Sequence, residues 1–71
     1  MEDFYLLTMR QVYEALKVKG YSPINQIVGY ILSEDPTYIT AYNGARHTIV
    51  KLDRDELLLK MLSKFFHDQA G

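Results

Sequence analysis

A chain of 71 residues can form one small domain, whose hydrophobic core is marginal. Because the chain has no cysteine, disulfides and cysteine-based zinc sites are excluded, and we expect self-association to stabilise the core. Its 48% hydrophobic content is that of a folded chain, while a net charge of −1 supplies no general attraction for nucleic acid or for anionic lipid. No apolar run is long enough to span a membrane, and Glu2 and Asp3 stand where a secretory signal would carry positive charge, so we expect a cytoplasmic protein with no membrane partner.

The first predicted helix covers roughly residues 4–19. Its apolar side chains recur at the spacing of one helical face, and Lys17 and Lys19 in the last turn oppose the negative end of the helix dipole. Gly20 then suits a left-handed stop. Residues 1–3 before the helix are expected to fray. The apolar face is made of Tyr5, Met9, Val12, Tyr13 and Leu16.

A second helix is predicted over about residues 23–32. Ser22 is an N-cap residue, and Pro23 suits the first helical position, where its missing N–H has no intrahelical partner to lose. Gly29 inside this helix costs about 1 kcal/mol relative to alanine. It either lets another backbone come close or is harmless, and the sequence leaves both readings open. The broad apolar face is made of Ile24, Ile27, Val28, Ile31 and Leu32.

The helical pattern breaks at residues 33–36, because a residue that precedes proline is disfavoured in helical geometry. Asp35 can cap a new turn that starts at Pro36. We expect one short helical turn over residues 37–39, with an extended segment over 37–40 as the open alternative. A third helix is predicted over roughly residues 41–52, with a start weakened by Gly44. Its apolar face is Tyr42, Ala45, Ile49 and Leu52.

The fourth predicted helix begins after Asp53. This residue is a candidate N-cap, and Glu56 would complete a capping-box-like pair with it, while Leu52 and Leu57 can form a hydrophobic staple. The apolar side chains of the helix cover well over half of its circumference, so we expect part of this surface to lie in an interface between two chains. They are Leu57, Leu58, Leu59, Met61, Leu62, Phe65 and Phe66. Residues 68–71 are expected to be a frayed tail.

These elements predict an all-α fold. We expect a small, compact bundle of about four helices plus a short helical turn, which forms a single domain over residues 1–71. The surplus apolar surface of the last helix predicts a homodimer.

No catalytic or metal-binding pattern is found along the chain. The acidic clusters at residues 34–35 and 53–56 lie at predicted helix starts, where capping explains them without chemistry. His47 and His67 are isolated, and the four glycines are too dispersed to form a phosphate-binding loop. We therefore expect no enzymatic activity and no cofactor.

A DNA-binding helix-turn-helix regulator is the alternative interpretation. The polar groups that could reach bases or phosphates are Asn43, Arg46, His47 and Lys51, with Arg54 just beyond. The balanced net charge leaves little of the counterion release that dominates DNA affinity, so nucleic acid is the less favoured partner. The six tyrosines suit either a wet protein interface or the small core.

The most distinctive stretch is Tyr21-Ser22-Pro23-Ile24-Asn25-Gln26-Ile27-Val28-Gly29-Tyr30, followed by Asp35-Pro36-Thr37-Tyr38-Ile39. It closely resembles the signature of the IreB family of small bacterial regulators. The resemblance continues upstream through Val12-Tyr13-Glu14-Ala15-Leu16 and downstream through Ala45-Arg46 and Asp53-Arg54-Asp55-Glu56, and it extends over roughly residues 12–66. The motif residues expected to support the subunit core or interface are Tyr21, Pro23, Asn25, Gln26, Gly29, Tyr30, Asp35, Pro36, Tyr38, Arg46, Arg54 and Glu56.

The resemblance implies a cytoplasmic, all-helical homodimer from Gram-positive bacteria (Firmicutes) that has no enzymatic activity. It also implies phosphorylation on threonine by a transmembrane serine/threonine kinase with PASTA repeats, and dephosphorylation by the cognate phosphatase. The implied role is negative regulation of intrinsic cephalosporin resistance, within the control of cell-envelope stress. The partners implied are a second copy of the chain, the kinase, the phosphatase and a downstream protein that the sequence does not identify.

Three features depart from the family pattern. Members usually carry the phosphorylated threonine on a polar N-terminal tail, whereas this chain begins almost at its first predicted helix. Thr8 is the only threonine before the central motif, but it falls within that helix, so it is a candidate to which we do not assign the phosphorylation. Thr40 and Ala41 stand where the family often has proline and arginine, and Val50 replaces a common basic residue.

Overall fold

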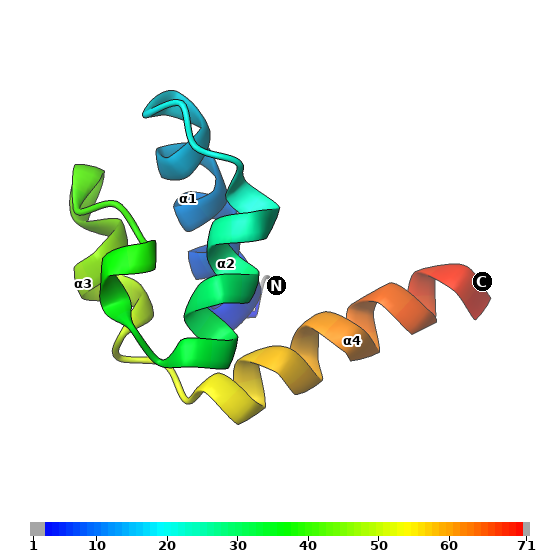
Figure 1. The fold of residues 1–71 in the computed structure, drawn as a ribbon. Helices are drawn as coiled ribbons and strands as arrows, with labels where there is room; N and C mark the ends of the chain where they lie inside the picture. Colours follow the sequence, from blue (N-terminus) through cyan, green and yellow to red (C-terminus); the bar gives the residue numbers. More distant parts are fainter. Residues whose placement is uncertain (1–2, 71) are drawn as a thin grey trace.

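The computed structural model of the protein describes residues 3–70 and is all-helical over that range, with no strand (Figure 1). The prediction of an all-α fold is therefore confirmed. The elements are α1 (Phe4–Val18), α2 (Pro23–Ser33), the single-turn 3-10 helices η1 (Pro36–Tyr38) and η2 (Tyr42–Gly44), α3 (Ala45–Ile49) and α4 (Arg54–Ala70).

Helix α1 forms the centre of the fold. Helices α2 and α3 pack against it, and α4 contacts it near its own beginning. The rest of α4 projects from this compact body, as Figure 1 shows, and the molecule measures 34 × 22 × 22 Å. The fold is thus a small helical body with one helix that extends away from it.

Helix α1 begins and ends with local caps. The Asp3 carboxylate accepts a hydrogen bond from the Tyr5 N–H at 2.8 Å, and Gly20 ends the helical segment with a φ of 84°, as its left-handed stop requires. The expectation of frayed ends falls partly on residues 1–2 and 71, which lie outside the described part of the chain. Within that part, Asp3 is held by its contacts, and α4 remains helical to Ala70.

Helix α2 starts at Pro23 as predicted, but its cap differs from the expectation. Ser22 has the extended backbone of an N-cap, yet within the described residues its side chain makes no capping hydrogen bond. The helix ends at Ser33, whose hydroxyl donates to the Gly29 carbonyl at 2.6 Å and accepts from the Asp35 N–H at 3.1 Å. Glu34 then turns the chain with a φ of 63°, a left-handed conformation that the sequence did not indicate.

The segment after α2 contains the helical turn η1, which confirms the predicted turn for Thr37 and Tyr38, whereas Ile39 is extended, as in the alternative. Asp35 caps η1, because its Oδ1 atom accepts from the Thr37 N–H at 3.0 Å and from the Thr37 hydroxyl at 2.7 Å. These two hydrogen bonds lower the pKa of Asp35, the hydroxyl having the larger effect. Ile39 follows with an extended backbone and lies fully buried.

The prediction of one helix over residues 41–52 was wrong. Asn43 and Gly44, at the end of η2, have φ values of 55° and 74°, and this left-handed pair breaks the helix before α3, which has only five residues. Asparagine and glycine are the residues that tolerate this conformation best, so the Asn-Gly pair breaks a helix that the apolar spacing alone would continue. Residues 50–52 form a turn before α4.

Helix α4 is capped by Asp53, whose Oδ1 atom accepts from the Asp55 N–H at 3.0 Å. The capping-box role predicted for Glu56 was wrong, because its side chain makes no hydrogen bond to Asp53 within residues 3–67. The Asp53 N–H instead donates to the Tyr5 hydroxyl of α1 at 3.4 Å. This contact from α1 provides the partner that a capping box would have supplied locally.

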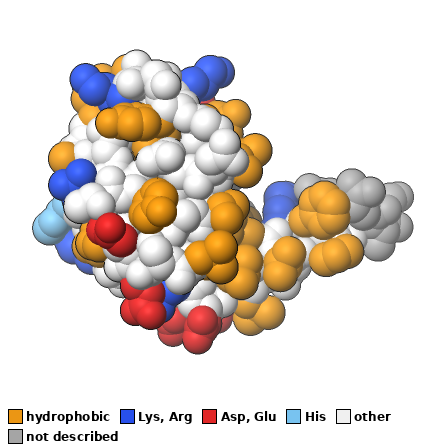
Figure 2. Space-filling view, in the orientation of Figure 1, with side chains coloured by type: hydrophobic (Ala, Val, Ile, Leu, Met, Phe, Trp, Pro, Cys, Tyr) orange, Lys and Arg blue, Asp and Glu red, His pale blue; other side chains and the backbone are white. Residues whose placement is uncertain are grey.

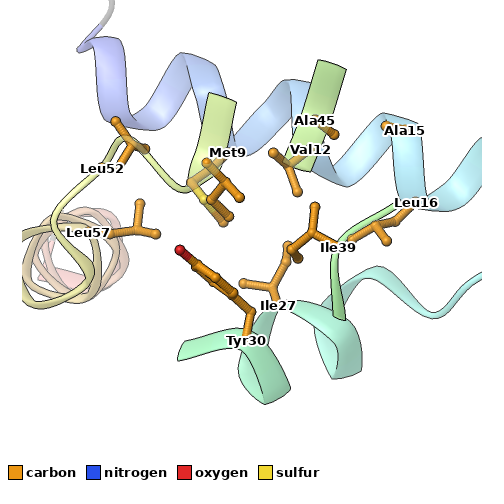
Figure 3. Packing of buried hydrophobic residues seen from close by; sticks show 11 residues of the cluster. Met9, Val12, Ala15, Leu16, Ile27, Tyr30, Ile39, Ala45, Leu52 and Leu57 are labelled. Carbon is orange, nitrogen blue, oxygen red and sulfur yellow. The ribbon is translucent and has the colours of Figure 1, made fainter. Parts of the chain in front are cut away.

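One hydrophobic core lies between α1 and the elements that pack on it (Figure 3). Leu52 and Leu57, the two residues of the predicted staple, are both buried in it. Tyr13, which the spacing placed on the apolar face of α1, is exposed. The buried residues of the core are Met9, Val12, Ala15, Leu16, Ile27, Tyr30, Ile39, Ala45, Ile49, Leu52 and Leu57.

Candidate functional site

The central motif first builds a close contact between α2 and η1. The Gln26 amide nitrogen donates to the Tyr38 carbonyl at 2.9 Å, so this polar side chain bonds to the turn that follows its own helix. The Tyr38 ring lies directly over Gly29, and a Cβ atom at Gly29 would overlap it. Glycine is needed at this position because the Tyr38 ring approaches the backbone of α2 closely. The close neighbour is thus a side-chain ring, and neither a second backbone nor an empty position.

Two further motif residues support this part of the fold. Tyr30 of α2 is buried in the core. Arg46 of α3 donates from Nε to the Ile39 carbonyl at 2.8 Å, and its own N–H donates to the Thr40 carbonyl at 3.1 Å. These two carbonyls belong to an extended stretch that does not pair with another strand. The hydrogen bonds from Arg46 satisfy them and hold the stretch against α3.

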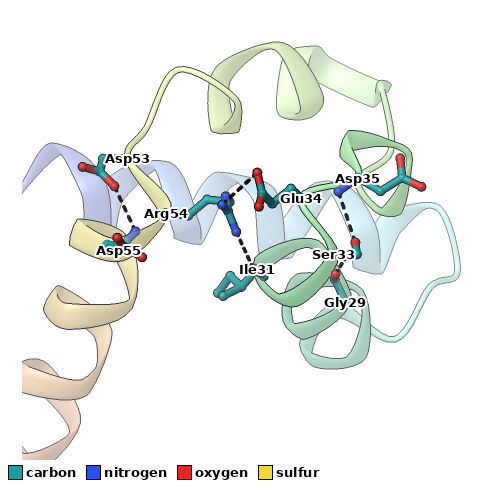
Figure 4. A network of polar contacts seen from close by, with 8 residues as sticks. All are labelled: Gly29, Ile31, Ser33, Glu34, Asp35, Asp53, Arg54 and Asp55. Carbon is teal, nitrogen blue, oxygen red and sulfur yellow. Dashed lines mark hydrogen bonds and ion pairs between the residues drawn. The ribbon is translucent and has the colours of Figure 1, made fainter.

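Arg54 joins the end of α2 to the beginning of α4 (Figure 4). Its Nη1 atom donates to the Ile31 carbonyl at 2.6 Å, and its Nη2 atom lies 3.0 Å from the Glu34 carboxylate. One guanidinium therefore satisfies a carbonyl in the last turn of α2 and pairs with the residue that ends this helix. The motif residues that make contacts thus hold the helices in place.

Other motif residues are not brought together by the fold. The side chains of Tyr21, Asn25 and Pro36 are exposed, while Pro23 and Glu56 are half-buried. Thr8, the candidate for phosphorylation, is only 2% exposed on the inner face of α1. Its hydroxyl is covered by the core in this fold.

An exposed apolar groove of about 470 Å³ lies between α1, α2 and α4, and we call it the apolar groove. Ile24 and Val28, two residues of the predicted apolar face of α2, are 67% and 48% exposed beside it. Hydrophobic side chains gather along this side of the body and continue over α4 (Figure 2). The groove is lined by Leu6, Met9, Arg10, Tyr13, Ile24, Ile27, Val28, Ile31, Leu58, Met61 and Lys64.

Helix α4 extends this surface beyond the body. Leu57 is buried and Met61 is half-buried, but the other apolar residues between positions 54 and 67 are exposed. Phe65 and Phe66 make an edge-to-face contact with each other, with ring centroids 5.1 Å apart, and both stay accessible. Contiguous exposed apolar surface of this kind is typical of a protein–protein interface.

The contact between the two ends of the chain was not predicted. Lys60 of α4 donates to the Asp3 carboxylate at 2.9 Å and lies over the Tyr5 ring, 5.6 Å from its centroid. The hydrogen bond from Lys60 lowers the pKa of Asp3, and the same contact raises the pKa of Lys60. No local pattern relates these residues, because they are 57 positions apart.

Other kinds of site find little support in the described residues. Among them, no three histidine, cysteine, aspartate or glutamate side chains lie close enough together to hold a metal ion. Nor is any helix in that part both long and apolar enough to cross a membrane. The third predicted helix, which carried the DNA-reading alternative, is reduced to the five residues of α3, and Arg46 on it is bonded to a backbone carbonyl.

One family model matches the chain over residues 3–67, and its description is IreB regulatory phosphoprotein. The match includes α1, α2, α3 and most of α4, together with the whole central motif and the residues that form its contacts. It therefore indicates a regulatory role. The chain belongs to the IreB family of regulatory phosphoproteins.

Proposed function

We propose that the protein is a non-enzymatic, cytoplasmic regulator that works as a homodimer and acts by binding other proteins. The observation that carries this proposal is the apolar groove in a chain of a regulatory family, since the fold leaves this apolar surface unburied. A catalytic role would need a cluster of reactive side chains, and the motif residues are instead used in contacts between helices.

The homodimer forms, in this proposal, when the exposed half of α4 from each protomer covers the apolar groove of the other. A two-fold arrangement makes such contacts reciprocal, so both protomers bury the same surface. Leu58 and Met61 belong to both the groove and α4, and Leu62 and Phe65 continue the apolar surface outward. Burial at about 25 cal/mol per Å² would supply the stability that a domain of this size lacks on its own.

The regulatory input we propose is reversible phosphorylation on threonine. A transmembrane serine/threonine kinase with PASTA repeats adds the phosphate, the cognate phosphatase removes it, and the protein negatively regulates cephalosporin resistance within the envelope-stress control of Firmicutes. Family membership supports this input. Because Thr8 is buried, a kinase reaches it only when α1 separates from the core.

Sedimentation equilibrium tests the homodimer. We expect a dimer at micromolar concentration, and a folded monomer under those conditions would refute the dimeric part of the proposal. Shielding of the groove can be measured in the same samples by hydrogen exchange at Ile24 and Val28, which should slow as the concentration rises.

Mass-spectrometric mapping after incubation with a PASTA kinase tests the input. The chain is compared with and without an upstream extension. Phosphate found only on the extension would place the input there, and phosphate on Thr8 would show that α1 opens. A fully unmodified protein in both cases would refute phosphorylation by this class of kinase.

No observation favours the alternative of a DNA-binding regulator. Two of its candidate groups, Arg46 and Arg54, donate to backbone carbonyls inside the fold. A gel-shift titration at physiological salt should accordingly show only weak, non-specific binding.

A further inference from the structure

The four threonines of the chain differ in how far solvent can reach them. Thr8 is 2% exposed on the inner face of α1. Thr40 and Thr48 are half-buried, and the Thr48 hydroxyl donates to the Gly44 carbonyl at 2.9 Å. Thr37, in the turn η1, is exposed. A kinase that transfers phosphate to threonine therefore finds one fully accessible acceptor hydroxyl among these four in the folded chain.

Thr37 lies in the connection between α2 and α3, where the backbone is held by few hydrogen bonds. η1 is a single 3-10 turn. Its Tyr38 N–H donates to the Asp35 carbonyl at 3.2 Å, and the Ile39 N–H donates to the Pro36 carbonyl at 3.0 Å. A short turn of this kind opens at a lower free energy than a helix that packs in the core. The segment around Thr37 can therefore enter the active site of a kinase more readily than residues of α1.

The Thr37 hydroxyl is part of the cap that holds η1. It donates to Asp35 Oδ1 at 2.7 Å, and the same oxygen accepts from the Thr37 N–H at 3.0 Å. The hydroxyl lowers the pKa of Asp35 more than any other contact does, so the carboxyl group is ionised at neutral pH. A carboxylate thus lies in direct contact with the oxygen that a kinase modifies.

We propose that Thr37 is a phosphorylation site and that its phosphate opens the cap of η1. The Thr37 oxygen attacks the γ-phosphorus of a nucleoside triphosphate, the new P–O bond forms, and the bond to the leaving nucleoside diphosphate breaks. A base of the kinase takes the hydroxyl proton. Hydrolysis of the ester by water, in the phosphatase, restores the hydroxyl and releases inorganic phosphate, so the change is reversible.

The phosphate acts on the cap in two ways. The ester oxygen has no proton, so it no longer donates to Asp35. The phosphate also brings a charge of about −1.5 to −2 at pH 7 to the side of this carboxylate. Because a hydrogen bond is lost and two anions face each other, the Asp35 side chain moves away and the Thr37 N–H loses its partner.

The opening of η1 reaches α2 because Tyr38, the next residue, packs on that helix. Its ring covers Gly29, and its carbonyl accepts from the Gln26 amide at 2.9 Å. Both contacts depend on the position of η1. Helix α2 in turn lines the apolar groove. Phosphate on Thr37 therefore acts on a helix that belongs to the proposed dimer surface.

This inference deepens the proposed function, because it rests on the threonine input and names the residue of this chain that receives it. The family description supports the modification without naming a residue. Thr37 does not line the apolar groove, so the proposed homodimer does not require it to be covered.

The site is tested by incubating the full chain with a PASTA kinase and ATP and mapping the phosphate by mass spectrometry. We expect phosphate on Thr37. Thr37→Val replaces the hydroxyl by a methyl group and should abolish the modification, whereas Thr37→Ser keeps a hydroxyl and should retain it. Thr48→Val makes the matched change at a half-buried threonine and should leave the modification unchanged. Circular dichroism reports whether each variant is folded.

The opening of η1 is tested by thermal denaturation and by NMR. The phosphorylated chain should melt about 4–8 °C below the unmodified chain. Its largest shifts should lie at Asp35, at Tyr38 and at the Gln26 side-chain amide. Thr37→Glu and Thr37→Gln have the same shape and differ by one charge, so Thr37→Glu should melt at the lower temperature of the two.

The results separate a failure of the site from a failure of the input. Phosphate on another threonine, or only on an upstream extension, would overturn the site and keep the proposed input. Phosphate on serine alone, or no phosphate with or without the extension, would refute both. An equal or higher melting temperature after phosphorylation of Thr37 would overturn the opening, and a rise is the result expected if Arg46 pairs with the phosphate and orders the turn.

Discussion

Residues 26–46 and helix α4 use their side chains in different ways. In the first region, polar groups find partners inside the chain: Gln26 bonds to the Tyr38 carbonyl, Arg46 to the Ile39 carbonyl, and the Tyr38 ring covers Gly29. Among residues 54–67 of α4, only Leu57 is fully buried, and most of the other apolar side chains face outward. The polar contacts of the first region are made within one protomer, whereas α4 leaves most of its apolar side chains between residues 54 and 67 uncovered.

The sharpest way to examine this difference is to truncate one leucine on each side of α4. Leu57→Ala leaves a cavity in the core and should lower the free energy of unfolding by about 2–5 kcal/mol. Leu62→Ala removes a side chain that is 48% exposed, so it should change the stability of the protomer by less than about 0.5 kcal/mol. Urea denaturation at fixed protein concentration measures the first effect.

Leu62→Ala should act instead on association. If α4 lies in the dimer interface, the dimer dissociation constant rises about fivefold or more, and sedimentation equilibrium measures it. An unchanged dissociation constant together with a large loss of protomer stability would mean that Leu62 belongs to the core and that the contrast within α4 is false.

The contact between Gly29 and Tyr38 provides a test of the first region. Alanine is the better helix former by about 1 kcal/mol, so propensity alone predicts that Gly29→Ala stabilises α2. The added Cβ overlaps the Tyr38 ring, and displacing the ring should instead lower the free energy of unfolding by about 1–3 kcal/mol. Thermal denaturation decides the sign.

The control for this prediction is the same substitution in a Tyr38→Ala background. Without the ring the overlap disappears, and Gly29→Ala should become neutral or stabilising. A loss of stability of equal size in both backgrounds would show that Tyr38 is not the cause.

Arg54 joins the two regions, and its removal should have a smaller effect. Arg54→Gln deletes the bond to the Ile31 carbonyl and the ion pair with Glu34, whose side chain is 70% exposed. The carbonyl bond should account for most of a loss of about 1–2 kcal/mol, since exposed ion pairs contribute little. Arg54→Lys keeps the charge but lacks the planar group that reaches both partners, so it should restore less than half of the loss in urea denaturation.

Signals that act over a few residues were predictable from the sequence. Pro23 starts α2, Gly20 ends the first helical segment, and Asp35 caps η1, because each depends only on neighbouring backbone groups. The third helix was mispredicted because the apolar spacing continues across Asn43 and Gly44, where the backbone is left-handed. Periodicity reports which side chains face the core, and it does not report a break between them.

The contacts of the candidate sites were not predictable from the sequence either, because they join residues that lie far apart along the chain. The sequence named Gln26, Arg46 and Arg54, but their partners are carbonyls whose positions depend on the whole fold. The apolar groove was predicted only in part. The sequence indicated an exposed apolar surface on the last helix, but it did not indicate that residues of α1 and α2 line the same groove.

The contact between Lys60 and Asp3 predicts the weakest effect, a dependence of stability on pH. The pKa of Asp3 is held below its usual 3.8 chiefly by the hydrogen bond from Lys60, so the folded state binds a proton less readily than the unfolded state. The contribution is therefore fully present above about pH 3.8 and is lost as the pH falls through the lower pKa of the folded state. Urea denaturation of the protein and of Asp3→Asn should show a difference at neutral pH that shrinks in acid. A difference that stays constant down to pH values below the folded pKa would mean that Asp3 stabilises α1 as a neutral cap and that Lys60 does not anchor α4 to α1 through charge.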